Sequence, residues 1–161
     1  MQPNIGLALT QLTGVAEILN TLLADEFVLY TKTRNYHWHV TGPQFHQLHL
    51  FFEEQYNALN TIVDDVAERV RSLGNKAFST LQEFVQAARL QEAPGEYPAA
   101  QRMLANLLAD HETVIQQLRG DVQTSLDTYQ DVGTSDFLTG LLEQHEKMAW
   151  MLRAHLEGSA A

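Results

Sequence analysis

Side chains that could bind a metal ion are concentrated in one stretch in the first half of the chain. The stretch contains two histidines on either side of a Thr-Gly-Pro-Gln segment and then three acids: His37, His49, Glu53, Asp64 and Glu68. The second histidine and the three acids are separated by four, eleven and four residues. Because about 3.6 residues make one helical turn, these four would share one stripe of a single helix. Imidazole and carboxylate groups bind borderline to hard divalent metals, so the spacing predicts a site for iron(II) or zinc(II).

The length of that helix predicts that the site is shared between two chains. The stripe lies roughly 130° from the apolar stripe of the same helix, so it faces away from the chain's own core. His49 and Glu53 form one pair, and Asp64 and Glu68 form a second pair roughly 20 Å further along the axis. One metal with bonds of about 2 Å cannot use both pairs. Two antiparallel copies, related by a twofold axis near residues 58 and 59, would bring opposite pairs together. The alternative is an ordinary solvated acidic face.

The surrounding sequence predicts a bundle of four long helices. Apolar residues recur at spacings of three and four, which predicts long helices at 5–38, 44–73, 98–129 and 135–157 and a short one at 79–90. Thr41 and Gln44 fit a capping box at the start of the second helix, and Gly74 suits its end. The first connection is tight and the second is long. We therefore expect an all-α, ferritin-like four-helix bundle with the short helix in the connection between helices two and three.

Composition sets the class of protein. A length of 161 residues predicts one domain over residues 1–161. The absence of cysteine excludes disulfides and thiolate metal sites. We find no signal-peptide pattern and no apolar run of the ~18–20 residues that a membrane span needs, so a soluble cytoplasmic protein is expected.

The charge balance disfavours nucleic acid as a partner. The chain has 20 acidic and 10 basic residues, for a formal net charge of −10, and no Lys or Arg precedes Lys32 or follows Arg153. Binding to DNA depends mainly on basic side chains that neutralise phosphates, whereas an acidic surface attracts cations. The charge balance therefore predicts that the protein does not bind DNA, and metal ions are the expected partners.

Several motifs together resemble the Dps family of mini-ferritins. They are Asn35-Tyr-His-Trp38, Gly42-Pro43, Asp64-Asp-Val-Ala-Glu-Arg69 and His145-Glu-Lys-Met-Ala-Trp-Met-Leu-Arg153. The resemblance covers almost the whole chain. It implies a hollow homododecamer with ferroxidase centres at twofold interfaces. It also implies a division of the ligands: one subunit supplies His37, His49 and Glu53, and its partner supplies Asp64 and Glu68.

The resemblance also implies an activity. Family members bind Fe(II), oxidise it preferentially with hydrogen peroxide and store ferric oxyhydroxide, which protects against oxidative stress. Two alternatives from the same resemblance are a DNA-compacting protein and a metal-binding cage with weak ferroxidase activity. The chain has Glu53 where the family often has Asp, and Leu50 where it often has Glu. A di-iron site inside one bundle would require Glu-x-x-His pairs, which the sequence lacks.

Other histidines have two interpretations each. His46 lies one turn before His49 and is either a further metal ligand or a partly buried, hydrogen-bonded residue. His39 is two residues from His37 and is expected at the surface. His111 and His145 lie on apolar helix faces and are predicted to be core residues.

Overall fold

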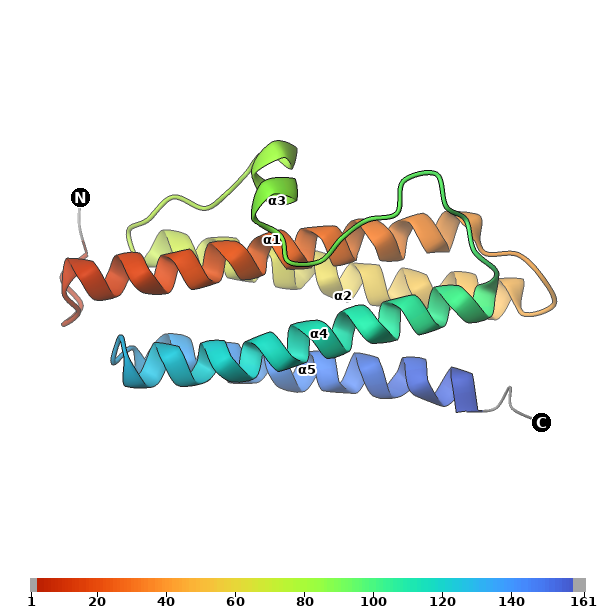
Figure 1. Cartoon of the computed structure of the whole chain (residues 1–161). Helices are drawn as coiled ribbons and strands as arrows, with labels where there is room; N and C mark the ends of the chain where they lie inside the picture. The colour runs from red at the N-terminus through yellow and green to blue at the C-terminus, as the bar shows by residue number, and fades with distance from the viewer. Residues whose placement is uncertain (1–2, 158–161) are drawn as a thin grey trace.

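The computed structural model describes residues 3–157, and these form an all-helical bundle. The helices are α1 (Leu9–His39), α2 (Phe45–Ser72), α3 (Leu81–Ala87), α4 (Ala100–Asp127) and α5 (Val132–Glu157). Figure 1 shows two antiparallel hairpins, α1–α2 and α4–α5, with α3 lying outside them. The long connection that carries α3 runs back along the bundle, so that α2 and α4 point the same way. The structure confirms the predicted fold class.

Local hydrogen bonds explain why two helices are shorter than predicted. Helix α1 begins at Leu9 because the Gln11 side chain accepts a hydrogen bond from the Ala8 N–H at 2.7 Å and its amide donates to the Tyr129 carbonyl at 2.8 Å. Helix α3 begins after Thr80, whose hydroxyl accepts from the Glu83 N–H while the Glu83 carboxylate accepts from the Thr80 N–H. Each helix therefore starts where a side chain satisfies its free N–H groups.

The turn between α1 and α2 is built differently from the prediction. The expected capping box of Thr41 and Gln44 is wrong, since Gln44 is the N-cap and no side chain caps it. Gly42 instead adopts a φ of 108°, a region that side chains with a Cβ disfavour, and its carbonyl accepts from the Phe45 N–H at 3.0 Å. Glycine therefore makes the reversal that brings the start of α2 back against the end of α1.

A buried aspartate starts α5 three residues earlier than predicted. Asp131 is 5% exposed, and its carboxylate accepts from the Thr134 N–H at 3.0 Å and from the Thr134 hydroxyl at 2.6 Å. The Arg69 guanidinium of α2 donates to the same hydroxyl at 2.9 Å and lies 3.5 Å from the Asp131 carboxylate. Asp131 thus caps α5 and ties it to α2.

We expect Asp131→Ala to destabilise the protein by about 1–2 kcal/mol, because the cap is lost and the Arg69 guanidinium loses its anionic partner. Differential scanning calorimetry of the assembled protein measures this as a lower melting temperature. Glu143→Ala, which removes an exposed acid from the middle of α5, is the matched control. Equal losses in the two variants would show that Asp131 is no more than a surface charge.

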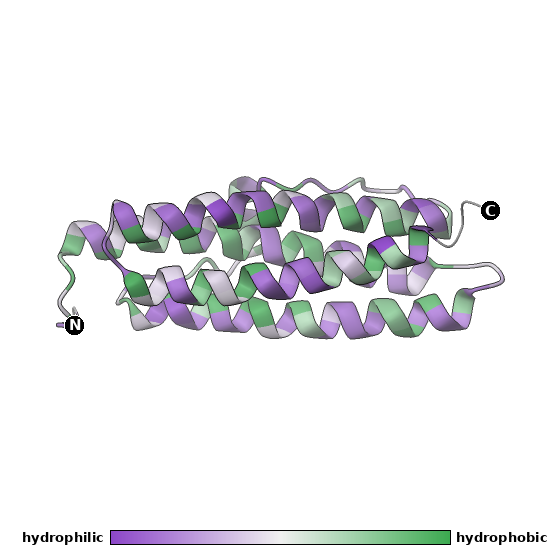
Figure 2. Cartoon of the chain, turned by 90° about the horizontal axis from the view of Figure 1, so that it is seen from below, coloured by the Kyte–Doolittle hydropathy of each residue, from purple (hydrophilic) through white to green (hydrophobic). Residues whose placement is uncertain are grey.

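The core is mainly apolar and lies between the two hairpins. Figure 2 shows hydrophobic and hydrophilic residues alternating along each helix, as amphipathic helices require. Buried side chains from all four long helices fill the interior, among them Leu19, Leu29, Phe52, Ile62, Leu104, Leu118, Leu138 and Leu152. At the start of α2, Phe45 is 45% exposed, whereas Phe51 is buried. Among residues 3–157, no helix is long and apolar enough to cross a bilayer.

Candidate metal centre

His37 and His49 lie against each other across the turn between α1 and α2. The two rings are stacked, with centroids 3.8 Å apart and planes 20° apart. Nδ1 of His37 is 2.8 Å from the backbone oxygen of His49, and Nδ1 of His49 is 2.9 Å from the backbone oxygen of His37. Two residues twelve apart in sequence are therefore joined by a reciprocal pair of hydrogen bonds, which the glycine turn makes possible.

These bonds fix the protonation of both rings. A carbonyl oxygen only accepts hydrogen bonds, so each Nδ1 must carry the proton, and the neutral ring then has its lone pair on Nε2. A metal-binding histidine is typically held in this way, with its other N–H donated to a backbone carbonyl or a carboxylate. His37 is only 7% exposed, and His49 is half-buried. The chain thus presents two imidazoles whose Nε2 atoms suit a divalent cation.

Glu53 lies one turn further along α2, beside Tyr56. The Tyr56 hydroxyl donates to the Glu53 carboxylate at 3.3 Å, and its ring stands edge-on to the His37 ring at 5.2 Å between centroids. Burial raises the pKa of the Tyr56 hydroxyl above 10.0, and the Glu53 charge raises it further. The hydroxyl therefore stays a donor at neutral pH, and Tyr56 contacts both the Glu53 carboxylate and the His37 ring.

A cation is held beside this group by aromatic rings. The Arg34 guanidinium lies 5.7 Å from the Tyr30 ring centroid, 5.3 Å from that of Trp38 and 5.3 Å from that of Tyr56. It also donates to the Tyr30 hydroxyl. Trp38 itself is 63% exposed in the single chain, and its ring takes part in this cation–π interaction.

The other predicted ligands lie elsewhere on α2. Asp64 and Glu68 are exposed and belong to the far part of the helix. Within residues 3–157, no group of three or more His, Asp or Glu side chains is close enough to bind one metal ion. The single chain thus brings together His37, His49 and Glu53 only in part, as a half-site. Completion by a partner's acids stays a prediction.

The remaining histidines divide between surface and core. His46 is exposed, so the partly buried interpretation is wrong and its side chain is open to a partner or an ion. His39 is also exposed, as predicted, and its Nδ1 is 2.8 Å from the Asn35 carbonyl. His111 and His145 are 1% and 0% exposed, which confirms them as core residues.

Sequence reasoning missed Tyr56 and Arg34. A signal existed for Tyr56, because it is seven residues after His49 and three after Glu53 and therefore lies on the same face of α2. Arg34 is three residues before His37 on α1, which places it on the same side of that helix. Its stacking on three aromatic rings required the relative placement of α1 and α2, which spacing does not give.

Comparison with known proteins finds similarity over nearly the whole chain. The family model of the ferritin-like domain matches residues 16–159. An uncharacterized low temperature-induced protein of Nostoc sp. is 50% identical over 155 residues, covering 96% of this chain and 87% of that protein. DNA protection during starvation protein 2 of Bacillus anthracis is 41% identical over 143 residues, covering 88% of this chain and 96% of that protein.

A solved structure agrees with these sequence matches. The crystal structure of the Dps protein from Vibrio cholerae O1, described as a member of a broad superfamily of ferritin-like diiron-carboxylate proteins, superposes with a TM-score of 0.89. The two chains are 32% identical, and the match covers 96% of each. The aligned regions therefore include both hairpins.

Proposed function

Because the chain belongs to the Dps family of ferritin-like proteins, we propose that it binds Fe(II), oxidises it and stores the ferric product. The single observation that carries this proposal is the reciprocal hydrogen bonding of His37 and His49, which leaves both Nε2 atoms free for a cation. Imidazole and carboxylate ligands suit Fe(II). The metal is here the substrate, and the related Vibrio cholerae protein is described as a diiron-carboxylate protein.

The complete centre in this proposal lies between two subunits. His37, His49 and Glu53 come from one chain, and Asp64 and Glu68 come from a partner related by a twofold axis, within a hollow dodecamer in the cytoplasm. Two features support sharing: the exposure of both partner acids, and the length of α2, which separates them from the histidines. His46 is exposed on the same helix and would be a further ligand at the edge of the site.

The chemistry is a two-electron reduction of hydrogen peroxide by two iron ions. Each Fe(II) loses one electron, the O–O bond breaks, and two protons complete two molecules of water. Hydrolysis of the ferric ions to oxyhydroxide then releases protons. Because both electrons are delivered together, no hydroxyl radical is left in solution. The protein supplies oriented ligands, and the electron transfer is the chemistry of the iron itself.

DNA compaction is the weaker alternative. Several relatives are named for DNA protection during starvation, but the formal net charge of this chain is −10. An acidic surface opposes phosphate binding and instead concentrates cations near the protein. We therefore assign protection to the removal of iron and peroxide. Zinc(II) suits the same ligands and is expected to compete with Fe(II) at the centre.

The test is an anaerobic Fe(II) titration followed by hydrogen peroxide. We expect about two Fe(II) oxidised per peroxide, faster than with oxygen, with the ferric product eluting with the protein on size exclusion and no spin-trapped hydroxyl radical. Protein preloaded with Zn(II) is the control and should oxidise iron slowly. Rates equal to those of protein-free buffer, or free ferric precipitate, would overturn the assignment.

A further inference from the structure

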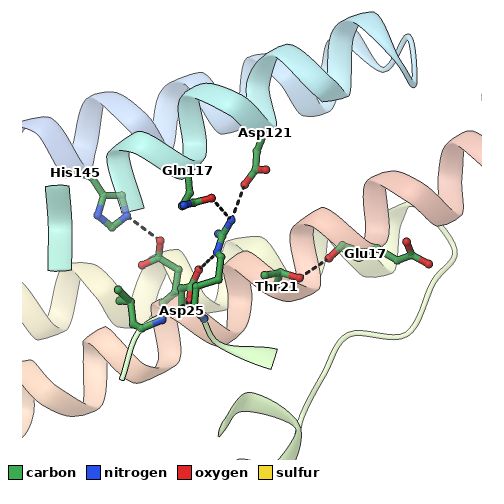
Figure 3. Close-up of polar contacts among 9 residues, drawn as sticks. Glu17, Thr21, Asp25, Gln117, Asp121 and His145 are labelled. Atoms are coloured by element: carbon green, nitrogen blue, oxygen red, sulfur yellow. Dashed lines mark hydrogen bonds and ion pairs between the residues drawn. The ribbon is translucent and has the colours of Figure 1, made fainter. Parts of the chain in front are cut away.

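Three buried ionisable side chains form a chain of contacts between the two hairpins. Glu26 of α1, His145 of α5 and His111 of α4 are 0%, 0% and 1% exposed, and we call them the buried triad. Nε2 of His145 is 2.8 Å from Oε1 of Glu26, and Nδ1 of His145 is 3.0 Å from Nδ1 of His111. Figure 3 shows His145 pointing from its helix toward the carboxylate of α1. The triad is thus the one place in the described core where the hairpins meet through an ion pair sealed from water on both sides.

The contacts, together with the charge on His145, assign the protons of the triad. A contact between two Nδ1 atoms needs one proton, because one nitrogen must donate and the other must accept. Burial and the His145 charge lower the pKa of His111, which makes His145 the imidazolium that lies between the Glu26 carboxylate and the His111 ring. His111 is then the neutral acceptor. Glu26, His145 and His111 carry −1, +1 and 0, so the buried group has no net charge, as a water-free site requires.

The Glu26 carboxylate is paired with His145 and makes no aligned hydrogen bond within residues 3–157. Oε2 of Glu26 has no hydrogen-bond partner among the described residues, and its Oε1 meets His145 at ion-pair distance without hydrogen-bond alignment. Nearby helix α2 contributes apolar buried side chains, apart from the amide of Gln55. An added proton therefore has no ready counter-ion within the site.

Other charges around the triad are already paired. Asp25, next to Glu26, meets Arg89 at 2.6 Å, and Arg89 also reaches Asp121 of α4 at 3.5 Å and Gln117 at 3.0 Å (Figure 3). Lys32 of α1 pairs at 2.5 Å with Asp110, the residue before His111.

The charges on the outer side of the α4–α5 hairpin are paired as well. Arg119 of α4 meets Glu146 of α5 at 2.5 Å, and Arg153 of α5 meets Glu112 of α4 at 2.8 Å. These pairs are solvent-exposed, so water screens them from the triad.

We propose that the buried triad is an acid-sensitive joint, which holds the α1–α2 hairpin against the α4–α5 hairpin at neutral pH and loosens it on acidification. The trigger is a second proton, taken up by His111. Two imidazolium rings would then face each other through nitrogens that are 3.0 Å apart, without water between them. Moving α4 and α5 away from each other or from Glu26 relieves that repulsion.

The direction of the pH effect follows from burial. Burial, reinforced by the charge of His145, holds the pKa of His111 well below the ordinary value of 6.5. His111 therefore binds a proton in the unfolded or opened chain at a pH at which it stays neutral in the closed chain. This contribution to stability is fully present above pH 6.5 and is lost as the pH falls toward the folded pKa. Opening should become about tenfold more favourable for each pH unit below 6.5.

Two nearby carboxyl groups change the stability of the closed state with pH in the direction opposite to His111. Burial raises the pKa of Asp110, against the lowering effect of Lys32, and raises that of Asp121, against the effect of Arg89. Such groups bind protons more readily in the closed state, so their contribution improves as the pH falls. A comparison of variants that keep both acids cancels this contribution and isolates the histidine.

The experiment measures backbone hydrogen–deuterium exchange of the intact assembly between pH 7 and pH 5, with exchange at the histidine C2 positions on the same samples. In the wild type, protection of the amides of α1, α4 and α5 should fall on the order of 30-fold more than in His111→Gln, which accepts a hydrogen bond but does not titrate. The midpoint for C2 exchange of His111 should lie below 6.5. His39→Gln, at an exposed site, should behave as wild type.

A second variant covers the case in which His111→Gln fails to assemble. Glu26→Gln removes the counter-ion of His145, so both histidines are neutral when buried and opening takes up two protons. The amide protection of Glu26→Gln should fall more steeply with decreasing pH than the amide protection of the wild type. A His111 midpoint at or above 6.5, an unchanged slope in His111→Gln, or a slope in Glu26→Gln no steeper than the wild type would each overturn the proposal. None of these readouts uses iron, so they are independent of the proposed oxidation.

Discussion

Replacing His37 with alanine is expected to lower the initial rate of Fe(II) oxidation by peroxide by at least about 100-fold. Residues that only support a metal ligand through a hydrogen bond are worth about 10- to 100-fold in metal affinity or activity, and removal of a ligand should cost more. His49→Ala should have the same effect, because it removes the second imidazole of the half-site, whose Nδ1 is held by the His37 backbone oxygen. Stopped-flow absorbance of the ferric product measures the rate.

The matched control for this experiment is His39→Ala. It removes an exposed imidazole from the same end of α1, bonded only to the Asn35 carbonyl and stacked at 4.4 Å on Tyr97. Its oxidation rate should be within about twofold of wild type, as for a surface change away from the site. Circular dichroism and size exclusion must show both variants folded and assembled. A His37→Ala protein that is folded, assembled and fully active would contradict the site.

The pattern of helices could be predicted because it depends on apolar periodicity, which is local to each segment. The helix ends depended on particular contacts. The start of α5 moved to Val132 because Asp131 is buried against Arg69, and that contact joins residues far apart in sequence. The supposed cap at Thr41 failed because the positive φ of Gly42 had already set the turn. Side-chain chemistry predicts candidates for caps, and tertiary packing selects among them.

The candidate site also combines features that local sequence predicts with features that only the packed fold determines. Spacing predicted that His49, Glu53, Asp64 and Glu68 belong to one helix, and all four lie on α2. It could not predict the reciprocal bonds between His37 and His49, because these require both helices and the turn at once. The buried triad left a clearer trace: Glu26 lies with Asp25 inside the long apolar run of α1. An acid in such a run must be paired when the helix is buried, so this is a signal for a partner on another helix that the sequence analysis did not use.

The turn between α1 and α2 and the candidate half-site depend on the same hydrogen bond. The C-terminal end of α1 has backbone carbonyls without partners in the helix, and the Nδ1–H of His49 satisfies the one at His37. The same bond orients the His49 ring for metal binding. Stability of the hairpin and readiness of the ligand therefore depend on one hydrogen bond, which links the fold to the proposed chemistry.

Mixing two inactive variants should restore activity if the centre is shared between chains. One variant carries His37→Ala and His49→Ala, and the other carries Asp64→Ala and Glu68→Ala; each alone should be nearly inactive. In a mixed twofold pair, one site combines the intact histidines of one chain with the intact acids of its partner, and the second site lacks both halves. Random equal mixing makes about half of the pairs mixed, so about one quarter of all sites become complete.

The mixed assemblies should therefore oxidise Fe(II) at about one quarter of the wild-type rate, after co-refolding and confirmation of mixing by native mass spectrometry. Co-refolding the acid-deficient variant with itself is the control and restores nothing. If each site belonged to one chain, no combination of the two variants would contain a complete site, and the mixed assemblies would stay inactive. Because helix length alone separates the two halves by roughly 20 Å, restored activity can arise only across an interface. Activity of the acid-deficient variant on its own would instead indicate a local half-site that works without Asp64 and Glu68.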